Sequence, residues 1–264
     1  MYMTAELPTT FPGVNKELLR NNVKHMYREV ARDPNGRFHF EIGRKLAERL
    51  GYQKEELDNI PSESVESFAG VGNVIALADI QEGDVVLDLG SGSGMDAFIA
   101  ALKAGQTGEV FGIEMTDAQL EKSRRLKKEG PFKHTYFIEG EIESLPIISN
   151  TIDTIISNGV INLSDRKKNV FKEAARVLKP GGKLVISDIL SAERLPESIT
   201  ADANLWAACI GGATEINEYS DFIRHAGFEI KSIQKNPYTF LSSSAKGATE
   251  KYGIQSLTIL AIKN

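Results

Sequence analysis

The chain contains 264 residues, of which 41% are hydrophobic and 25% are charged, and its formal net charge is −5 at pH 7. This composition excludes a disordered or fibrous chain, and the acidic balance argues against a general affinity for nucleic-acid phosphates. The single cysteine excludes an internal disulfide, and no apolar run approaches the roughly 18 residues of a membrane span. Because no signal-peptide pattern opens the sequence, we expect a cytoplasmic protein without membrane or nucleic-acid partners.

The region before residue 71 predicts helices. Apolar residues recur at three- and four-residue steps between residues 15 and 32, which indicates an amphipathic helix. A second helix is predicted over 38–50, closed by Gly51, and a short helical piece begins at Glu55. These helices precede the alternation of strands and helices. Residues 1–70 are therefore expected to form either a cap on the sheet edge or a lid over an active site.

A buried strand and a glycine-rich turn follow. Residues 85–89 are apolar or β-branched apart from Asp88, three glycines occupy every second position from Gly90 onward, and residues 95–102 predict a helix. Glycine is needed in such a turn because it adopts positive φ readily and lets a ligand approach the backbone closely. Strand, glycine turn and helix together are typical of a cofactor site in an open α/β sheet.

The spacing of the turn favours a particular cofactor. A dinucleotide fingerprint that begins at Gly90 needs its last glycine at position 95, where this chain has Met95. A fingerprint that begins at Gly92 ends at Ala97, which is a permitted variant, but Asp88 would then face the pyrophosphate of the dinucleotide and repel it. A cationic ligand without phosphate, such as S-adenosylmethionine, meets no such conflict. The pattern Asp88-x-Gly90-x-Gly92-x-Gly94 resembles the first motif of class I S-adenosylmethionine-dependent methyltransferases. The alternative is a glycine turn with a purely structural role.

The rest of the chain continues the alternation. Further strands are predicted at 109–114, 134–139, 151–157, 183–188, 228–234 and 255–262, and further helices at 117–129, 164–178 and 218–226. Thr116 and Gln119 predict a capping box, and Ser164 a helix cap. Seven strands with interleaved helices predict a Rossmann-like, doubly wound and mostly parallel α/β sheet, and the resemblance implies an antiparallel last strand. Residues 71–264 would form this cofactor domain, with an irregular insertion for the acceptor pocket at about 190–215.

Several side chains stand where a cofactor would bind. Glu114 ends the second strand, and an acid there can accept both ribose hydroxyls because neighbouring strand ends share one crevice; a surface acid is the alternative. The resemblance implies that Glu141 binds the adenine amine and that Ile142 covers the ring, although a solvated loop is also compatible with this acidic stretch. Asn158 ends the fourth strand at the topological switch point. The expected cofactor-binding residues are Asp88, Gly90, Ser91, Gly92, Gly94, Asp96, Glu114, Met115, Gln119, Glu141, Ile142 and Asn158.

A narrower resemblance covers residues from about Gly36 to Phe228. Six phrases together resemble the arsenite S-adenosylmethionine methyltransferase family: ESFAGVGN, DLGSGSGMD, EMTDAQL, SNGVINLSD, RVLKPGG and LWAACIGGA. In that family cysteine thiolates hold trivalent arsenic, a soft ion. The resemblance places two of these cysteine positions at Val71 and Gly159, and only Cys209 remains. One thiolate cannot chelate arsenic, so we expect a changed acceptor, or else thiols supplied by a second chain or by glutathione.

The acceptor pocket is expected at Gly70, Val71, Gly159, Trp206 and Cys209. The catalytic residues stay open, with His39, Asn158 and Cys209 as candidates, and Cys209 is equally compatible with a small buried hydrophobe. The predicted activity is methyl transfer from S-adenosylmethionine to a small molecule, with S-adenosylhomocysteine as product, no resident metal, and a monomer or homodimer. The alternatives are a binding protein without turnover, arsenite methylation with external thiols, and a nicotinamide oxidoreductase.

Overall fold

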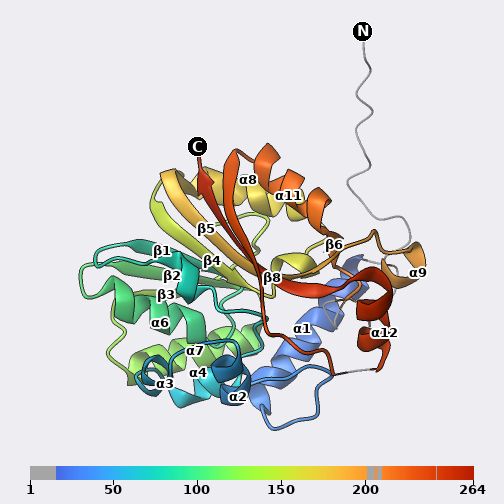
Figure 1. The fold of residues 1–264 in the computed structure, drawn as a ribbon. Coiled ribbons are helices and arrows are strands. Elements are labelled where there is room, and N and C mark those ends of the chain that lie inside the picture. Colours follow the sequence, from blue (N-terminus) through green and yellow to red (C-terminus); the bar gives the residue numbers. More distant parts are fainter. Residues whose placement is uncertain (1–15, 201–205, 207–209, 242) are drawn as a thin grey trace.

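Figure 1 shows a computed structural model of the chain, in which the structure describes residues 16–200, 206, 210–241 and 243–264. One sheet runs through the molecule in the order β3-β2-β1-β4-β5-β8-β7, and the short β6 pairs with β5. The strands are β1 (Val85–Leu89), β2 (Glu109–Glu114), β3 (Thr135–Glu139), β4 (Ile152–Asn158), β5 (Leu178–Ser191), β6 (Thr214–Glu215), β7 (Phe228–Lys235) and β8 (Gln255–Lys263).

Strand β8 runs antiparallel to both β5 and β7, whereas the other strand pairs are parallel. The predicted doubly wound, mostly parallel sheet with an antiparallel last strand is therefore confirmed. The additional strand is β6, two residues long, which lies in the stretch that the sequence predicts to be irregular and helical. Thr214 and Glu215 pair there with the end of β5.

Helices cover both faces of the sheet because side chains along a strand alternate between the two faces. The covering helices are α5 (Ile75–Ala78), α6 (Met95–Ala104) and α7 (Asp117–Glu129) on one face, and α8 (Lys167–Val177) and α11 (Ile216–His225) on the other. Val86 of β1 belongs to the hydrophobic cluster of the first face, and its neighbours Leu87 and Leu89 belong to that of the second. The carboxyl ends of the parallel strands therefore meet at one edge, between two packed layers.

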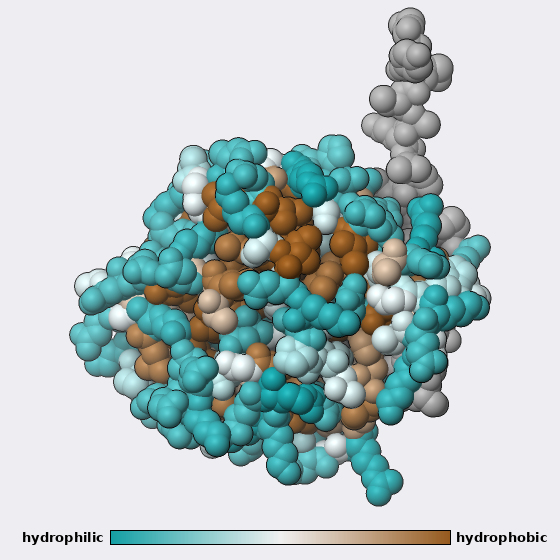
Figure 2. Space-filling model, in the orientation of Figure 1, coloured by the Kyte–Doolittle hydropathy of each residue, from teal (hydrophilic) through white to brown (hydrophobic). Residues whose placement is uncertain are grey.

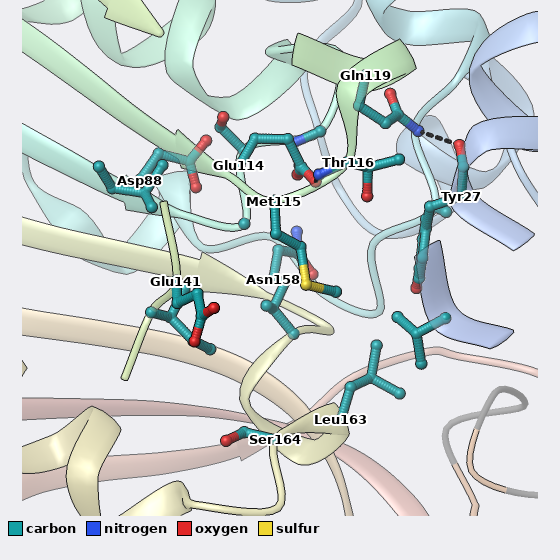
Figure 3. Close-up of a pocket in the computed structure, with 18 of the residues that line it drawn as sticks. Tyr27, Asp88, Glu114, Met115, Thr116, Gln119, Glu141, Asn158, Leu163 and Ser164 are labelled. Carbon is teal, nitrogen blue, oxygen red and sulfur yellow. Dashed lines mark hydrogen bonds between the residues drawn. The ribbon is translucent and has the colours of Figure 1, made fainter. Parts of the chain in front are cut away.

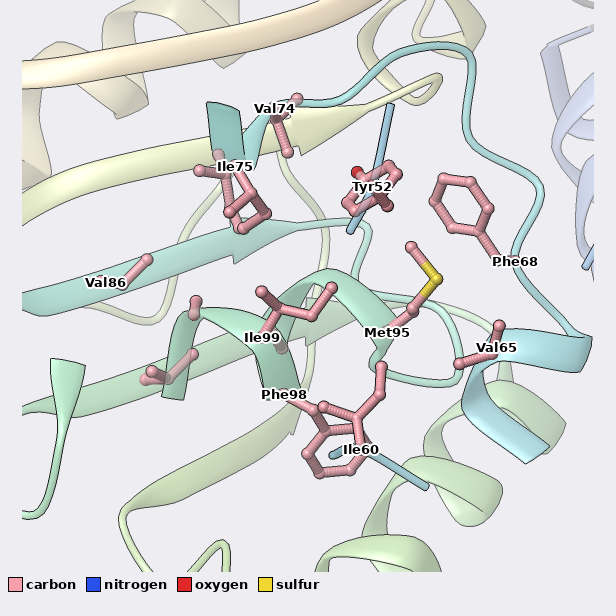
Figure 4. Packing of buried hydrophobic residues seen from close by; sticks show 14 of the residues in the cluster. Tyr52, Ile60, Val65, Phe68, Val74, Ile75, Val86, Met95, Phe98 and Ile99 are labelled. Carbon is pink, nitrogen blue, oxygen red and sulfur yellow. The ribbon is translucent and has the colours of Figure 1, made fainter. Parts of the chain in front are cut away.

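Four further helices precede β1: α1 (Lys16–Arg32), α2 (Arg44–Arg49), α3 (Lys54–Asp58) and α4 (Ser62–Glu66). Residues from this region take part in the main core. Figure 4 shows Tyr52, Ile60 and Val65 in the same cluster as Met95 and Phe98 of α6. The chain between α2 and β1 is thus packed onto β1 and α6.

The predicted helix over 38–50 is wrong for its first half. Gly43 adopts φ +84° at the start of α2, a conformation that a continuous helix cannot accommodate, and only Arg44–Arg49 are helical. Phe38 and Phe40 instead stack on each other, with ring centroids 5.7 Å apart, and Phe40 stacks on Tyr27 of α1. Phe38 and Phe40 therefore belong to a loop that packs on α1.

The predicted capping box at α7 and the predicted cap at Ser164 are also wrong. Thr116 occupies the N-cap position of α7 as predicted, but its side chain makes no capping hydrogen bond within the described structure. Gln119 donates instead to the backbone carbonyl of Tyr27, at 3.0 Å. Helix α8 begins at Lys167 with Arg166 at its N-cap position, and the Ser164 hydroxyl accepts the Arg166 N–H at 3.0 Å. The elements that sequence patterns did not predict include η1 (Ile161–Leu163) and α12 (Ser243–Tyr252), whereas α9 (Glu197–Thr200) lies in the stretch at about 190–215 that was expected to be helical but irregular.

The surface is mixed in polarity. Figure 2 shows hydrophilic side chains along the margin of one face and apolar side chains gathered nearer its centre, around the C-terminal strands. Ile233 of β7 is 43% exposed. Among the helices of the described segments, none combines the length and the apolar character that crossing a membrane would require.

Candidate functional site

A cavity of about 550 Å³ lies at the carboxyl ends of β1, β2 and β4, with α1 along one side, a size typical of small-molecule sites. All the residues predicted to bind a cofactor line it, except Gly94. Gly70 of the predicted acceptor set also lines it. Figure 3 shows Asp88, Glu114 and Glu141 on one side of this cavity and Tyr27 and Leu163 on the other. The sheet thus brings residues from distant parts of the sequence to one pocket.

The glycine turn has the conformation that the spacing predicted. Gly90 and Gly92 adopt φ +70° and +53°, which L side chains rarely occupy. A Cβ on Gly90 would lie 2.5 Å from the Val160 side chain, so the turn and the segment after β4 are in close contact. Gly94 also has positive φ, but a Cβ there would meet Phe137 at 2.7 Å. Gly94 therefore serves packing of the turn and does not line the cavity.

Two buried polar atoms at this turn have no hydrogen-bond partner among the described residues. They are Oδ2 of Asp88 and Oγ of Ser91, both in the pocket lining. Burial raises the pKa of Asp88 well above its usual range, and the nearby carboxyls of Asp96 and Glu114 raise it further. Buried carboxylates are costly without a partner. The turn therefore suits a ligand that brings a positive charge and hydrogen-bond donors, as the ammonium and sulfonium groups of S-adenosylmethionine do.

Glu114 is fixed by backbone donors from both sides. Its Oε2 accepts the Gly92 N–H at 2.9 Å, and its Oε1 accepts the Thr116 N–H at 2.7 Å. Burial raises the pKa of Glu114, and these backbone hydrogen bonds oppose the shift. Each carboxylate oxygen has a second lone pair. The side chain is thus held rigidly at the end of β2 with acceptor capacity left for a ligand hydroxyl.

Asn158 holds the loop that precedes α5. Its Oδ1 accepts the N–H groups of Val71 and Gly72 at 2.8 and 3.2 Å, and its Nδ2 donates to the Gly72 carbonyl at 2.8 Å. The same Nδ2 lies 3.0 Å from Oδ2 of Asp96, whose Oδ1 accepts the Tyr52 hydroxyl at 2.5 Å. The amide is therefore engaged with protein groups, which favours a positioning role over a catalytic one.

The chemistry of Asp96 follows from the same network. Burial raises the pKa of Asp96 to about 6, while hydrogen bonds from Tyr52 and Asn158 oppose the shift. Sequence reasoning missed Tyr52, because its partner is 44 residues away and lies in another element. The only available signal was the position of Tyr52 just after a helix-ending glycine, which is not specific.

Glu141 is paired with two arginines. It forms ion pairs with Arg20 of α1 and with Arg166, the latter at 3.2 Å. The hydrogen bond from Arg20 is the main reason that the pKa of Glu141 is lowered. The residue expected to bind adenine therefore also connects the cofactor side of the pocket to α1. Ile142 lines the cavity beside it.

The residues predicted to bind the acceptor or to act in catalysis do not lie together in the structure. Val71 and Gly159 adjoin each other, since a Cβ on Gly159 would lie 3.4 Å from Cγ1 of Val71, but neither is in the described lining of the cavity. Trp206 is 1% exposed and packs behind α1 rather than facing the cavity. His39 is exposed and stacks edge-on against Phe40, away from the described lining. Cys209 lies outside the described residues.

Comparison with known proteins places the chain in a family. Residues 80–237 match the model of the methyltransferase domain. The arsenite methyltransferase of Halobacterium salinarum is 35% identical over 187 residues, 71% of this chain and 48% of that protein. The human arsenite methyltransferase is 38% identical over 184 residues, 66% of this chain and 48% of that protein. The chain thus spans about half the length of these relatives.

The solved structures give the same result. The crystal structure of an arsenic(III) S-adenosylmethionine methyltransferase from Chlamydomonas reinhardtii superposes with a TM-score of 0.65 at 30% identity, covering 85% of this chain and 75% of that one. The chain therefore belongs to the methyltransferase domain family, as a Rossmann-like class I S-adenosylmethionine-dependent methyltransferase of the arsenite methyltransferase-like kind.

Proposed function

We propose that this chain transfers a methyl group from S-adenosylmethionine to a small-molecule acceptor, and that this acceptor is not free arsenite. The observation that carries the proposal is a pair of buried atoms without a hydrogen-bond partner among the described residues, Asp88 Oδ2 and Ser91 Oγ, beside the positive-φ glycine turn. The family assignment leaves no support for the nicotinamide alternative.

The residues of the pocket can divide the cofactor between them. Asp88 and Asp96 would accept hydrogen bonds from the ammonium group and attract the sulfonium charge. Glu114 would accept the ribose hydroxyls, and Glu141 with Ile142 would hold the adenine. When bound, S-adenosylmethionine supplies both the methyl group and the leaving group. The chain then has to align the acceptor in the pocket, with Asn158 holding the adjacent loop in place.

The exclusion of arsenite is supported by the corner formed by Val71 and Gly159. These positions stand where the resembled family has cysteines, and the structure brings them together. Val71 is 1% exposed and packs with apolar neighbours such as Ile189 and Ile210. Neither side chain offers a soft donor atom to trivalent arsenic.

We also propose that α1 acts as a lid over the cofactor, within the N-terminal region 1–70. Its buried residues Leu19 and Val23 belong to a small hydrophobic cluster that is separate from the two clusters on the faces of the sheet. Polar contacts also hold the helix, among them the Arg20–Glu141 pair and the hydrogen bond from Gln119 to the Tyr27 carbonyl. Such contacts can open without disturbing the core. Amide exchange in residues 16–32 should slow when S-adenosylhomocysteine is added. Equal exchange with and without this ligand would leave α1 as a static cap.

Calorimetry tests the cofactor assignment. S-adenosylhomocysteine should bind, whereas NAD and NADP should not, and binding of a dinucleotide alone would overturn the proposal. A cell extract incubated with radiolabelled S-adenosylmethionine then distinguishes an enzyme from a binding protein. Labelled small-molecule product is expected, and binding without transfer to any extract component would support the binding-protein alternative.

A further inference from the structure

One side of the pocket is apolar and is formed by a single hydrophobic cluster. We define the apolar wall by the five members that line the cavity: Leu19, Val23, Tyr27, Met115 and Leu163. Leu19 and Val23 of α1 are 3% and 2% exposed, and Trp206 backs the cluster from behind. Figure 3 shows Tyr27 and Leu163 across the pocket from Asp88, with Met115 between the two sides. A ligand group that contacts the apolar wall therefore lies across the pocket from Asp88 and the glycine turn.

Each positively charged residue in the described part of the lining already takes part in an ion pair. Arg20 and Arg166 are the arginines of the described lining, and both pair with Glu141. The remaining charged lining residues are acidic: Glu17, Asp88, Asp96, Glu114, Glu143 and Asp165. A carboxylate or phosphate on the acceptor would meet either like charge or apolar surface, and both are unfavourable.

We infer that the methyl acceptor is an organic molecule with an uncharged, apolar body, such as an aromatic ring, that packs on the apolar wall. This inference rests on the proposed function and specifies its substrate class. Packing an apolar body on the wall removes hydrocarbon from water on both partners. It also leaves the reactive atom of the acceptor directed toward Met115 and Asn158, where the two sides of the pocket meet.

A matched pair of aromatic thiols makes the inference testable. In para-toluenethiol and para-mercaptobenzoate the same sulfur is the nucleophile, and only the opposite ring substituent changes from methyl to carboxylate. The thiol proton is lost to buffer before binding. The thiolate lone pair then forms the new bond to the methyl carbon, and the electron pair of the broken bond stays on the donor sulfur, giving a methyl sulfide and S-adenosylhomocysteine.

We expect kcat/KM for para-toluenethiol to exceed that for para-mercaptobenzoate by about tenfold or more. Leu163→Gln should reduce this ratio severalfold, whereas Leu102→Gln, at an exposed position of α6 outside the pocket lining, should leave it unchanged. Affinity for S-adenosylhomocysteine should be equal in all three proteins. An equal or reversed preference in the unmodified protein would overturn the inference.

Binding of the products keeps the test decisive if turnover is slow. With S-adenosylhomocysteine bound, calorimetry should detect methyl para-tolyl sulfide and not para-(methylthio)benzoate. Absence of binding by the neutral sulfide in that complex would overturn the apolar acceptor class while leaving the cofactor assignment intact. Failure of S-adenosylhomocysteine itself to bind would instead contradict the proposed function.

Discussion

Asp88, Ser91 and Glu114 come from two adjacent strand ends, whereas the apolar wall combines α1, the residue after β2 and the η1 turn. The first side is polar, and its geometry follows from glycine spacing and strand register. The second is hydrophobic and depends on how α1 docks across the sheet edge. The contrast indicates that the side proposed to bind the cofactor is set by local sequence, whereas the side proposed to bind the acceptor is set by long-range packing.

The largest expected effect is a loss of stability at the glycine turn. Gly90→Ala forces an L side chain into φ +70° and places its Cβ 2.5 Å from Val160. Strain and overpacking together should cost roughly 2–6 kcal/mol in the free energy of unfolding. Urea denaturation measures this loss. Gly247→Ala is the matched control, because no atom lies within 4 Å of its Cβ position and its φ is unstrained. Equal stability of the two variants would contradict the close contact at the turn.

The next effect is on cofactor affinity rather than on stability. Glu114→Ala should weaken S-adenosylhomocysteine binding by roughly 1–3 kcal/mol, the scale of hydrogen bonds to a charged group. Glu121→Ala, at an exposed position of α7, should bind like the unmodified protein. Calorimetry gives both dissociation constants. Unchanged affinity in Glu114→Ala would overturn the ribose assignment.

Titration of Asp96 changes the charge on the side of the pocket that carries the glycine turn and leaves the apolar wall uncharged. Burial raises its pKa to about 6, so the folded protein holds this proton at pH values where the unfolded chain has lost it. Its contribution therefore lowers stability as pH rises from the ordinary aspartate pKa toward about 6. The ionised carboxylate accepts a stronger hydrogen bond from the ammonium group that S-adenosylhomocysteine carries, so affinity for this ligand should increase as the pH rises through about 6. Asp96→Asn should flatten this pH profile, and an identical profile in the variant would assign it to another group.

The smallest effect concerns the contact that joins the two sides. Arg20 and Glu141 are 41% and 37% exposed, so solvent screens their ion pair. Arg20→Ala should cost less than about 1 kcal/mol in stability. It should nevertheless speed amide exchange in α1, whereas Arg224→Ala, which removes another exposed ion pair on α11, should not. Unaltered exchange in residues 16–32 would mean that the pair does not hold the helix.

The predictions from sequence succeeded where structure is local. The strands and the glycine turn follow from periodicity and from the common edge of parallel strand ends. The positions of Glu141 and Ile142 were expected from the family resemblance, and both line the cavity. The failures have physical causes. Gly43 has a positive φ that ends the predicted helix over 38–50, and Gln119 bonds to α1 instead of closing a capping box.

The acceptor side was predicted less well because it depends on tertiary contacts. Trp206 and Val71 were expected in the acceptor pocket, yet both are buried behind its lining. Tyr52 reaches Asp96 from a separate helical region, and Leu19 and Val23 were recognised only as the apolar face of a helix. A periodic pattern shows that a face is buried, but it does not show which surface covers it.

Methylarsenic production by the unmodified protein, with arsenite and S-adenosylmethionine and no added thiol, shows whether free arsenite is the methyl acceptor. Millimolar glutathione and the variant Val71→Cys/Gly159→Cys serve as comparisons, although φ +74° at Gly159 disfavours a side chain there. We predict no methylarsenic from the unmodified protein under conditions in which S-adenosylhomocysteine binds. Robust turnover of arsenite without thiol would contradict the claim that the acceptor side has diverged while the cofactor side is retained.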